Sequence, residues 1–428
     1  MRLVLRSLPP RLALIVIESA AFVALTIWAG KVYLGDVISR RVSIENLGLA
    51  SQLDQGNSDY YLKLGRLYEY SLTDVNPTKA IEDLTRAAQL NPMDAQPWLD
   101  LGAAEEVTGR IDDASISLRR ANYLAPTQPG FQWAIANFFL LHGDTKEAMS
   151  HFRVVLAGTG QYNEIIFNTA WKAIGNGKEI LASLIPDNAD TEVRYMDYLI
   201  HKGQLADAQG VWDRFVTEHQ SFDPRLAAYF MDVLMGTGHP DQAYKVWTDL
   251  ESHHLVLDPA EPGNLLSNGD FESDLGNFGF TWRFYATQGV YIGLDTTVFR
   301  SSGHSTVISF TGSSGNLFYE GLQHWVKVTP GTAYQARAYL KTEDITTDSG
   351  PRLWVHDPVK PTVFSKFSDQ LVGTNAGWTL LTVDFTPKTS YVTVAITRMP
   401  SQKLDNVISG KVWVDDVSVV RAGRPDQP

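Results

Sequence analysis

Hydrophobic residues follow three different spacings along this chain. An almost uninterrupted apolar run comes first, from Leu12 to Ala29, and Glu18 is its one break. From Ile44 to about Ser252 apolar residues recur at helical spacing, and beyond Gly263 they alternate with polar residues in short segments. A long apolar run indicates a membrane span, a 3.6-residue period indicates a helix, and alternation indicates a half-buried strand. The pattern therefore predicts an apolar helix, an all-α region and an all-β region, in that order.

The apolar helix is long enough to cross a bilayer. At ~1.5 Å per residue, Leu12 to Leu34 reaches about 35 Å, against a hydrocarbon core of ~30 Å. Ile27-Trp28-Ala29 places a bulky residue where a cleaved signal peptide has small ones, which favours an uncleaved anchor. Glu18 is interpreted as a carboxylate that snorkels or is protonated, rather than as a functional group. We expect residues 1–43 to form a cytoplasmic stub, one transmembrane helix and a short linker.

Three alanines set the period of the helical region, because Ala80, Ala114 and Ala148 stand 34 residues apart. This is the length of one helix-turn-helix repeat, in which small residues lie where two helices cross and a proline follows the second helix. The surrounding pattern is fullest at Trp98, Leu101, Gly102, Leu118, Ala121 and Pro126. These positions resemble tetratricopeptide (TPR) repeats. We predict an α-solenoid over residues 44–256, with five recognisable helix pairs and one eroded pair between Gly158 and Asp187.

The resemblance to TPR proteins implies a protein or peptide partner bound in a concave groove. The alternative is that the helices act only as a spacer. Both interpretations stay open at this point.

Short alternating segments follow a Pro- and Gly-containing linker at residues 257–262. About nine of them lie between Trp282 and Val420, and turn signals such as Thr329-Pro330-Gly331-Thr332 separate them. Strands without intervening helices are typical of a two-sheet sandwich. We predict an all-β sandwich of the jelly-roll type at residues 263–421, followed by a tail at 422–428.

The two ends of this region carry a second resemblance. Residues 264–272 read NLLSNGDFE and residues 412–419 read VWVDDVSV. With Val328 to Tyr334 and Tyr339 to Thr342 between them, the region resembles carbohydrate-binding modules of the family 4, 9 and 22 group, whose fold is galactose-binding-like. The resemblance implies glycan binding outside the cytoplasm, although sandwiches of this outline also serve as plain structural modules. Together with the slight positive-inside bias, it predicts a single-pass protein of a bacterial inner membrane with its bulk outside the cytoplasm.

Aromatic side chains beside hydrogen-bonding groups are the candidate sugar platforms, because a pyranose ring has an apolar face and a polar rim. Trp325 alternates with Val326, and Trp354 alternates with Leu353 and Val355, so both indoles are expected to point away from the core. The candidate ligand-binding residues are Trp325, Trp354, Tyr339, Gln323, Arg337 and His356, of which the two tryptophans rank first.

The acidic ends of the sandwich suggest a structural calcium site, as in the modules that the region resembles. Calcium takes about six to eight oxygen ligands, which a clasp between the first and last strands would gather. The candidate ligands are Asp270, Glu272, Asp415 and Asp416. The alternative is that these acids cap turns and face water.

Composition and motifs narrow the function. A formal net charge of −12 leaves no basic surface for phosphates, so no nucleic-acid partner is expected. The sequence contains no cysteine, which excludes disulfides and thiolate metal sites. It contains no Gly-x-Ser-x-Gly elbow, no His-Glu-x-x-His motif and no complete phosphate loop, so we expect no enzyme.

The expected function is a membrane-anchored envelope scaffold whose repeats bind a protein and whose sandwich binds a glycan, in polysaccharide synthesis or export. One alternative is a structural assembly protein in which both domains bind protein. A second alternative is an accessory subunit of a glycoside-active complex.

Overall fold

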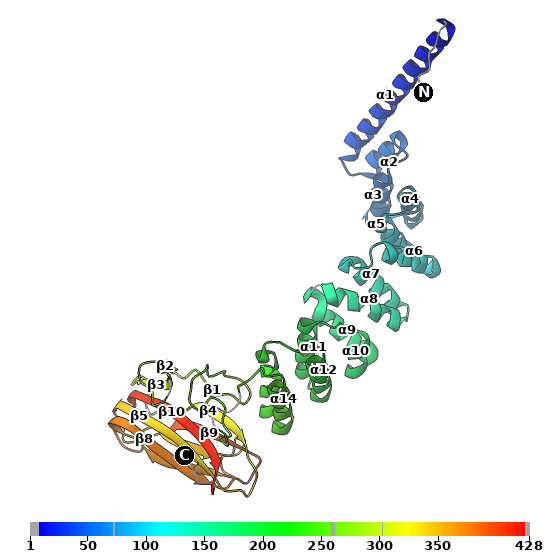
Figure 1. Cartoon of the computed structure of the whole chain (residues 1–428). Helices are drawn as coiled ribbons and strands as arrows, with labels where there is room; N and C mark the ends of the chain where they lie inside the picture. The colour runs from blue at the N-terminus through cyan, green and yellow to red at the C-terminus, as the bar shows by residue number, and fades with distance from the viewer. Residues whose placement is uncertain (1–7, 72, 159, 258–261, 302, 424–428) are drawn as a thin grey trace. The chain divides into compact units, whose positions relative to one another are not determined.

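The computed structural model describes residues 8–71, 73–158, 160–257, 262–301 and 303–423. The chain divides into two compact units, Met1–Thr191 and Glu192–Pro428. The predicted linker at residues 257–262 lies almost wholly outside the described residues. The boundary between the units instead falls within helix α11 (Ala189–His201), so the second unit contains the last helices together with the strands. Figure 1 labels these elements.

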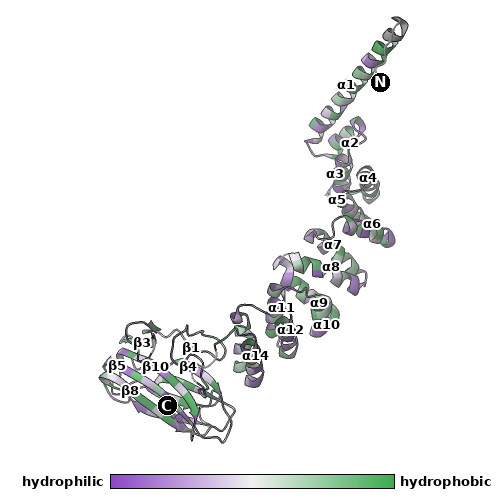
Figure 2. Ribbon diagram, in the orientation of Figure 1, coloured by the Kyte–Doolittle hydropathy of each residue, from purple (hydrophilic) through white to green (hydrophobic). Residues whose placement is uncertain are grey.

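The first helix, α1 (Leu8–Ser39), contains the apolar run, whose residues appear largely green in Figure 2. Among the described residues it is the one helix long and apolar enough to cross a membrane, a test that a signal sequence also passes. The helix continues beyond the predicted span. Gly35 and Ser39 are buried where α1 packs on α2 (Ile44–Leu53), and Gly35 lies against Tyr60 of α3 (Ser58–Tyr70). Residues 35–39 are therefore packed helix, where the sequence predicted part of a linker.

Helices pack in consecutive pairs after α2. In the first unit the pairs are α3 with α4 (Pro77–Leu90), α5 (Ala95–Val107) with α6 (Ile111–Leu124), α7 (Pro129–Leu141) with α8 (Thr145–Gly158), and the shorter α9 (Asn163–Ile174) with α10 (Gly177–Ser183). A 3-10 turn, η1 (Gly160–Tyr162), precedes α9. The α9–α10 pair is the eroded repeat.

The 34-residue alanines lie in the second helix of three pairs, and all three are fully buried. The packing of the helix pair also explains the glycine of the repeat pattern, Gly102. A Cβ at Gly102 would lie 2.6 Å from Leu118 Cγ, so only glycine lets this leucine of the paired helix approach so closely. The prediction of a TPR-like helical region is confirmed.

The second unit begins with further helices: α11, α12 (Leu205–Glu218), the 3-10 turn η2 (Pro224–Ala227), α13 (Ala228–Gly236) and α14 (Pro240–Ser252). Trp212 and Trp247 are buried in α12 and α14, as the repeat pattern predicts for packing positions.

The strands form two antiparallel five-stranded sheets. The first has the order β1 (Arg283–Phe284), β4 (Tyr319–Lys327), β9 (Tyr391–Arg398), β6 (Arg352–His356) and β7 (Ser365–Gln370). The second has the order β2 (Val290–Asp295), β3 (Ser305–Thr311), β10 (Ser409–Arg421), β5 (Tyr334–Ile345) and β8 (Gly373–Phe385). Inward side chains of both sheets form one core, which confirms the predicted β-sandwich.

Strand β7 is the element that the sequence pattern did not predict. Its segment, SKFSDQ, is mostly exposed because β7 pairs with β6 at the edge of its sheet. An edge strand with few buried side chains has no apolar alternation to reveal it. Its position proves important for Trp354.

Helices α13 and α14 pack against the sandwich within the second unit. Phe278 and Phe280 are buried, and both rings lie about 6 Å from that of Trp247, at 6.1 and 5.9 Å. Gly279 between them has a φ of +50°, and a Cβ there would lie 2.7 Å from Met231 Cε. The last helix pair and the sandwich therefore share an apolar contact.

Candidate functional site

The outer face of sheet β1-β4-β9-β6-β7 brings four predicted ligand residues together. Gln323 and Trp325 come from β4, and Trp354 and His356 come from β6; their strand neighbours Leu322, Val326, Leu353 and Val355 are in the core. In the register of the sheet, Trp325 and His356 both pair with Thr393 of β9. Gln323 and Trp354 both pair with the next outward residue, Ala395. We call these two adjacent rows of side chains the Trp325 face.

Trp354 points away from the core as predicted, but it is not a free platform. Its side chain is covered, with the residue 7% exposed. The indole stacks on His356 at 3.8 Å and on Phe367 of β7 at 5.2 Å. Its Nε1–H donates to Ser365 Oγ at 2.8 Å. Because β7 supplies two of these contacts, the sequence could not show that this tryptophan is covered.

Trp325 is the more open of the two indoles. It is half-buried, and the described residues offer no hydrogen-bond acceptor to its Nε1–H. The neighbouring Thr393 is 1% exposed, and its hydroxyl also has no partner among the described residues. This hydroxyl is itself covered, so a ligand on the face would contact the indole and not the hydroxyl. The half-open indole and the half-buried Gln323 amide are the aromatic face and the hydrogen-bonding group that a sugar ring requires.

Tyr339 and Arg337 lie elsewhere. Both belong to β5 of the other sheet, on the face opposite to the core residues Ala336 and Ala338. The Arg300 guanidinium lies 3.6 Å above the Tyr339 ring. Arg337 Nε donates to Gln335 Oε1 at 2.6 Å. The six predicted ligand residues therefore do not form one patch, and these two do not join the Trp325 face.

The two ends of the sandwich meet, as the clasp hypothesis expects. The N–H of Leu265 donates to Val419 O at 3.0 Å, and the N–H of Val417 donates to Gly269 O at 2.8 Å. The Asn264 side chain also bonds β10, accepting the N–H of Val419 at 2.9 Å. The segment at 264–271 is thus fixed along the end of the last strand.

The acids of β10 face a loop that begins at Arg300. Asp415 is fully buried and accepts the N–H of Arg300 at 2.7 Å, and burial raises the pKa of its carboxyl to about 6. Asp416 accepts from the Arg300 guanidinium and from Ser301 Oγ at 2.6 Å. A cationic side chain is therefore already present beside these two carboxylates.

Glu272 contacts the other end of the same loop. It accepts the N–H groups of Gly303 and His304 at 2.8 and 2.9 Å, and the Gly303 bond is the main cause that lowers the pKa of this carboxyl. Residue 302 lies outside the described residues. The described residues bring no three of the four predicted ligands, Asp270 included, within common reach of one ion. The observed contacts of these acids hold the loop at Arg300 to His304 against the strand, and calcium binding stays a prediction.

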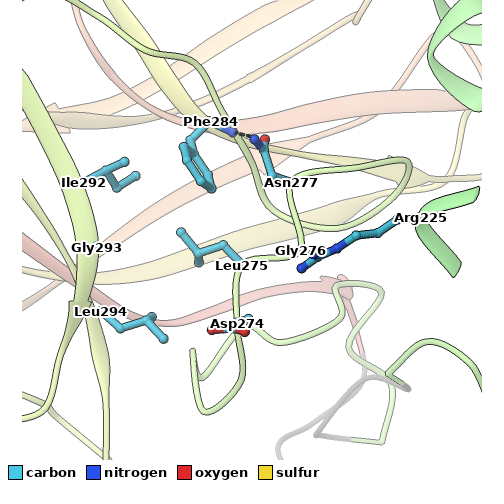
Figure 3. Close-up of a pocket in the computed structure, with 9 residues that line it drawn as sticks. All are labelled: Arg225, Asp274, Leu275, Gly276, Asn277, Phe284, Ile292, Gly293 and Leu294. Atoms are coloured by element: carbon cyan, nitrogen blue, oxygen red, sulfur yellow. Dashed lines mark hydrogen bonds between the residues drawn. The ribbon is translucent and has the colours of Figure 1, made fainter. Parts of the chain in front are cut away.

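A pocket of about 490 Å³ was not foreseen from the sequence (Figure 3). Its floor is apolar, formed by Leu275, Phe284, Ile292 and Leu294 at the open edges of the two sheets, where β1 and β2 are edge strands. Arg225 of η2 extends toward Gly276 at its rim (Figure 3). These residues are distant in sequence and only the fold brings them together, so no local sequence motif predicts the pocket.

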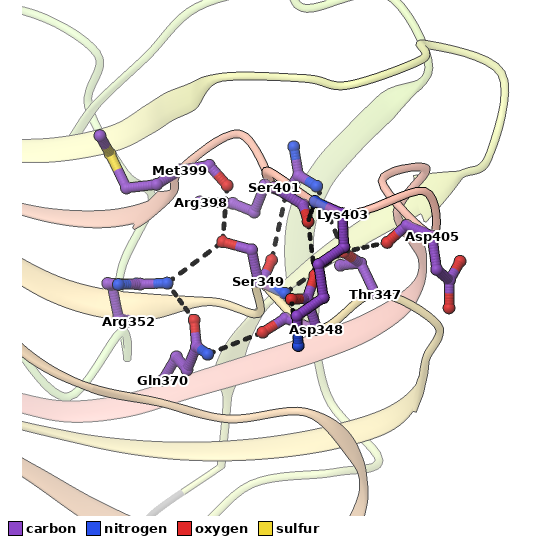
Figure 4. A network of polar contacts seen from close by, with 10 residues as sticks. All are labelled: Thr347, Asp348, Ser349, Arg352, Gln370, Arg398, Met399, Ser401, Lys403 and Asp405. Carbon is purple, nitrogen blue, oxygen red and sulfur yellow. Dashed lines mark hydrogen bonds and ion pairs between the residues drawn. The ribbon is translucent and has the colours of Figure 1, made fainter.

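A buried arginine organises the loops at one end of β9 (Figure 4). Arg398 is fully buried, and its guanidinium donates to Ser349 O at 3.1 Å and to Asn406 O at 2.7 Å. Arg352 of β6 joins the same network through Ser349 Oγ at 3.2 Å. The network fixes the loop at the Arg352 end of the outer face.

A second polar cluster lies in the helices of the second unit. Glu192 is fully buried, and Arg214 and His219 both contact its carboxylate, at 2.6 and 2.8 Å. The charge of this acid is therefore already compensated within the protein.

Comparisons with known proteins give likenesses of fold only. No protein-family model matches the sequence, and no curated protein is similar to it. Among solved structures, MamA is 17% identical, and the match covers 41% of this chain and 85% of that chain with a TM-score of 0.26. PilF of Pseudomonas aeruginosa is 14% identical over 53% of this chain and 91% of that chain, with a TM-score of 0.26.

A third solved structure is similar at the same low level. The CBM22-1–GH10 modules of Clostridium thermocellum xylanase 10B, solved with xylohexaose, are 15% identical over 36% of this chain, with a TM-score of 0.25. This chain spans only 28% of that xylanase chain. All three TM-scores are below 0.5, so the fold and the site rest on this chain's own residues.

Proposed function

We propose that this chain is a non-enzymatic, membrane-anchored scaffold of a bacterial envelope. In this proposal α1 anchors the chain, the helical repeats bind a protein partner, and the sandwich binds a polysaccharide through the Trp325 face. Polysaccharide synthesis or export is the process that joins a membrane, a protein assembly and a glycan in this way.

The observation that carries the proposal is the combination at Trp325. The indole is half-buried, and the half-buried amide of Gln323 lies in the adjacent row of the same face. Covering ~80 Å² of a sugar ring at about 25 cal/mol/Å² stabilises a complex by roughly 2 kcal/mol. One such platform supports only weak binding.

The test measures binding of the full chain, purified in detergent, to a broad polysaccharide array. Trp325→Ala should lower affinity about thirtyfold, as expected for a loss of roughly 2 kcal/mol. Tyr291→Ala is the matched control, since Tyr291 is an exposed aromatic residue on β2 of the other sheet. If the intact chain binds no polysaccharide, the structural-assembly function replaces the glycan-binding one. If the chain binds polysaccharide and Trp325→Ala binds it as well as wild type, Trp325 is not the sugar platform.

The anchor is tested separately by extraction. The full chain should stay with membranes in high salt and in carbonate, because the mostly apolar segment from Leu12 to Leu34 buries its side chains in lipid. Protease added to spheroplasts should digest the repeats and the sandwich. Release by salt would remove the anchor from the proposal, and full protection would reverse the topology.

A further inference from the structure

Cationic side chains lie at both ends of the Trp325 face. The chain carries a formal net charge of −12. Two cations flank the Trp325 face, Lys327 on β4 and Arg352 on β6, and neither has a carboxylate partner among the described residues. Cations that form no ion pair within the protein attract negatively charged ligands.

Lys327 lies at one end of the face. It follows Trp325 by two residues on the same strand, so both side chains project from the same side of the sheet. Its Nζ lies 4.0 Å from the centre of the Tyr244 ring of α14 and 6.0 Å from that of Tyr391. The rings hold the ammonium group in place, and it forms no ion pair with the described residues.

Arg352 lies at the other end. It precedes Trp354 by two residues, and its guanidinium contacts Ser349 Oγ at 3.2 Å and the side-chain oxygen of Gln370 (Figure 4). Both partners are neutral, so the arginine keeps its full charge. Arg283 on β1 provides the contrast, because Asp232 of α13 neutralises it at 2.9 Å.

Two carboxylates also contact residues at this face. Glu320 Oε1 lies 2.8 Å from His356 Nε2, and the side chain is 25% exposed. Asp241 of α14 accepts the hydroxyl of Tyr391 at 2.8 Å. Neither acid forms an ion pair with Lys327 or Arg352 among the described residues.

We propose that the polysaccharide bound at the Trp325 face is acidic, with carboxylate groups of the uronic-acid type. This inference rests on the proposed glycan-binding function. One sugar ring lies on Trp325, while carboxylates farther along the same chain pair with Lys327 and Arg352. The planar guanidinium suits bidentate contact with a carboxylate, and the ammonium binds as a point charge.

The spacing of the two cations suits a polymer rather than a single sugar. Lys327 pairs in register with Tyr391 and Arg352 with Thr397, at opposite ends of β9. At ~3.4 Å per residue these positions are about 20 Å apart. One monosaccharide cannot reach both, so the two contacts fall on different residues of one glycan chain.

The test uses hexamers of galacturonate, glucuronate and mannuronate, each beside the same hexamer with its carboxyl groups reduced to alcohols. Affinities are measured by calorimetry with the full chain in detergent. The tightest ligand should be an acid, and its reduced form should bind about tenfold more weakly. Binding of the acid should also weaken as salt is added, because salt screens these exposed charges.

Substitutions of the two cations distinguish the contribution of charge to binding from that of the Trp325 platform. Lys327→Gln and Arg352→Gln should each weaken the acidic hexamer by roughly fivefold and leave the reduced hexamer unchanged, whereas Arg352→Lys should keep part of the affinity. Lys411→Gln is the control, since Lys411 lies on β10 of the other sheet and is also exposed. It should change neither affinity.

Each contrary outcome has a distinct meaning. If a reduced hexamer binds as tightly as its acid and Trp325→Ala abolishes this binding, glycan binding stands and the acidic preference is overturned. If acidic hexamers bind, and Lys327→Gln and Arg352→Gln weaken this binding while Trp325→Ala does not, the preference for acidic glycans stands. In that case Trp325 is not the sugar platform. If no hexamer and no array polysaccharide binds, both fall.

Discussion

The helical repeats and the sandwich bury their side chains in different ways. In the repeats, the residue that fills a space comes from the same helix pair, as Leu118 does beside Gly102. In the sandwich, the first segment is held by the last strand, and the bond from the N–H of Val419 to Asn264 joins residues 155 apart in sequence. Because contacts in the repeats are local, the spacing of residues in the sequence predicts the repeat core. Contacts in the sandwich join residues distant in sequence, so the sequence does not show which residues pack against each strand.

The two regions also differ in what their aromatic residues reveal. Trp212 and Trp247 fall at repeat packing positions, and both are buried as the pattern predicts. Trp325 and Trp354 follow the same strand alternation, yet one is half-open and the other is covered. Alternation identifies the face of the sheet, but the neighbouring strands decide the exposure.

The largest expected effect is a loss of stability from two glycine substitutions, one in the sandwich and one in the repeats. A Cβ at Gly269 would lie 2.1 Å from the backbone oxygen of Val417, which cannot move aside, so Gly269→Ala should destabilise the sandwich by roughly 3 kcal/mol or more. At Gly102 a Cβ would meet mainly the Leu118 side chain, with the backbone oxygen of Ala114 at 3.3 Å, so Gly102→Ala should cost less, about 1–2 kcal/mol. Urea unfolding of each variant measures this, with Gly293→Ala in open space as the control. Equal losses at Gly102 and Gly269 would contradict the distinction.

The second prediction concerns the two strand tryptophans. Trp354→Ala removes a covered, stacked ring and should cost about 3 kcal/mol of sandwich stability. Trp325→Ala removes a half-open ring and should cost less than about 1 kcal/mol. Thermal unfolding followed by near-ultraviolet circular dichroism compares the two variants. A larger loss for Trp325→Ala would show that the two roles are reversed.

The third prediction concerns acid stability, which two buried groups of the sandwich influence in opposite directions. Burial lowers the pKa of His324 from 6.5 to about 4, so the unfolded chain binds this proton first and the native state loses stability as pH falls from 6.5 to 4. Burial raises the pKa of Asp415 from 3.8 to about 6, so the native state gains stability as pH falls from 6 to 3.8. Each shift corresponds to about 3 kcal/mol.

Variants separate these opposite slopes. His324→Gln should leave a sandwich whose stability rises on acidification, and Asp415→Asn should leave one whose stability falls. Urea midpoints at several pH values between 7 and 4 provide the measurement. If both variants show the same dependence of stability on pH as wild type, His324 and Asp415 do not cause that dependence.

The smallest expected effect tests the calcium hypothesis at the clasp. Calcium at 100 times its Kd should stabilise the sandwich by about 2.7 kcal/mol, a melting shift of a few degrees. Because the Arg300 guanidinium already contacts Asp416, Arg300→Gln should enlarge the shift. A melting temperature that EDTA leaves unchanged in calcium-loaded protein, for wild type and variant alike, would end the hypothesis.

The sequence by itself determined the order of the regions and the identity of most elements. The 34-residue alanine period located the helix pairs, because each pair repeats the same local crossing of small and large residues. Alternation located nine of the strands and the outward direction of Trp325 and Trp354, because successive side chains of a strand must point to opposite faces.

Only the tertiary structure decided which of these residues are accessible. Strand β7 carries almost no buried side chains, so no pattern announced it, yet its Phe367 and Ser365 cover Trp354. The placement of Arg300 beside Asp416, and of Tyr339 on the sheet opposite Trp325, likewise depends on which strands pair. The exposure and the ion pairs of a side chain depend on neighbours that are distant in sequence. The order of the strands determines which neighbours these are, and local sequence patterns do not encode that order.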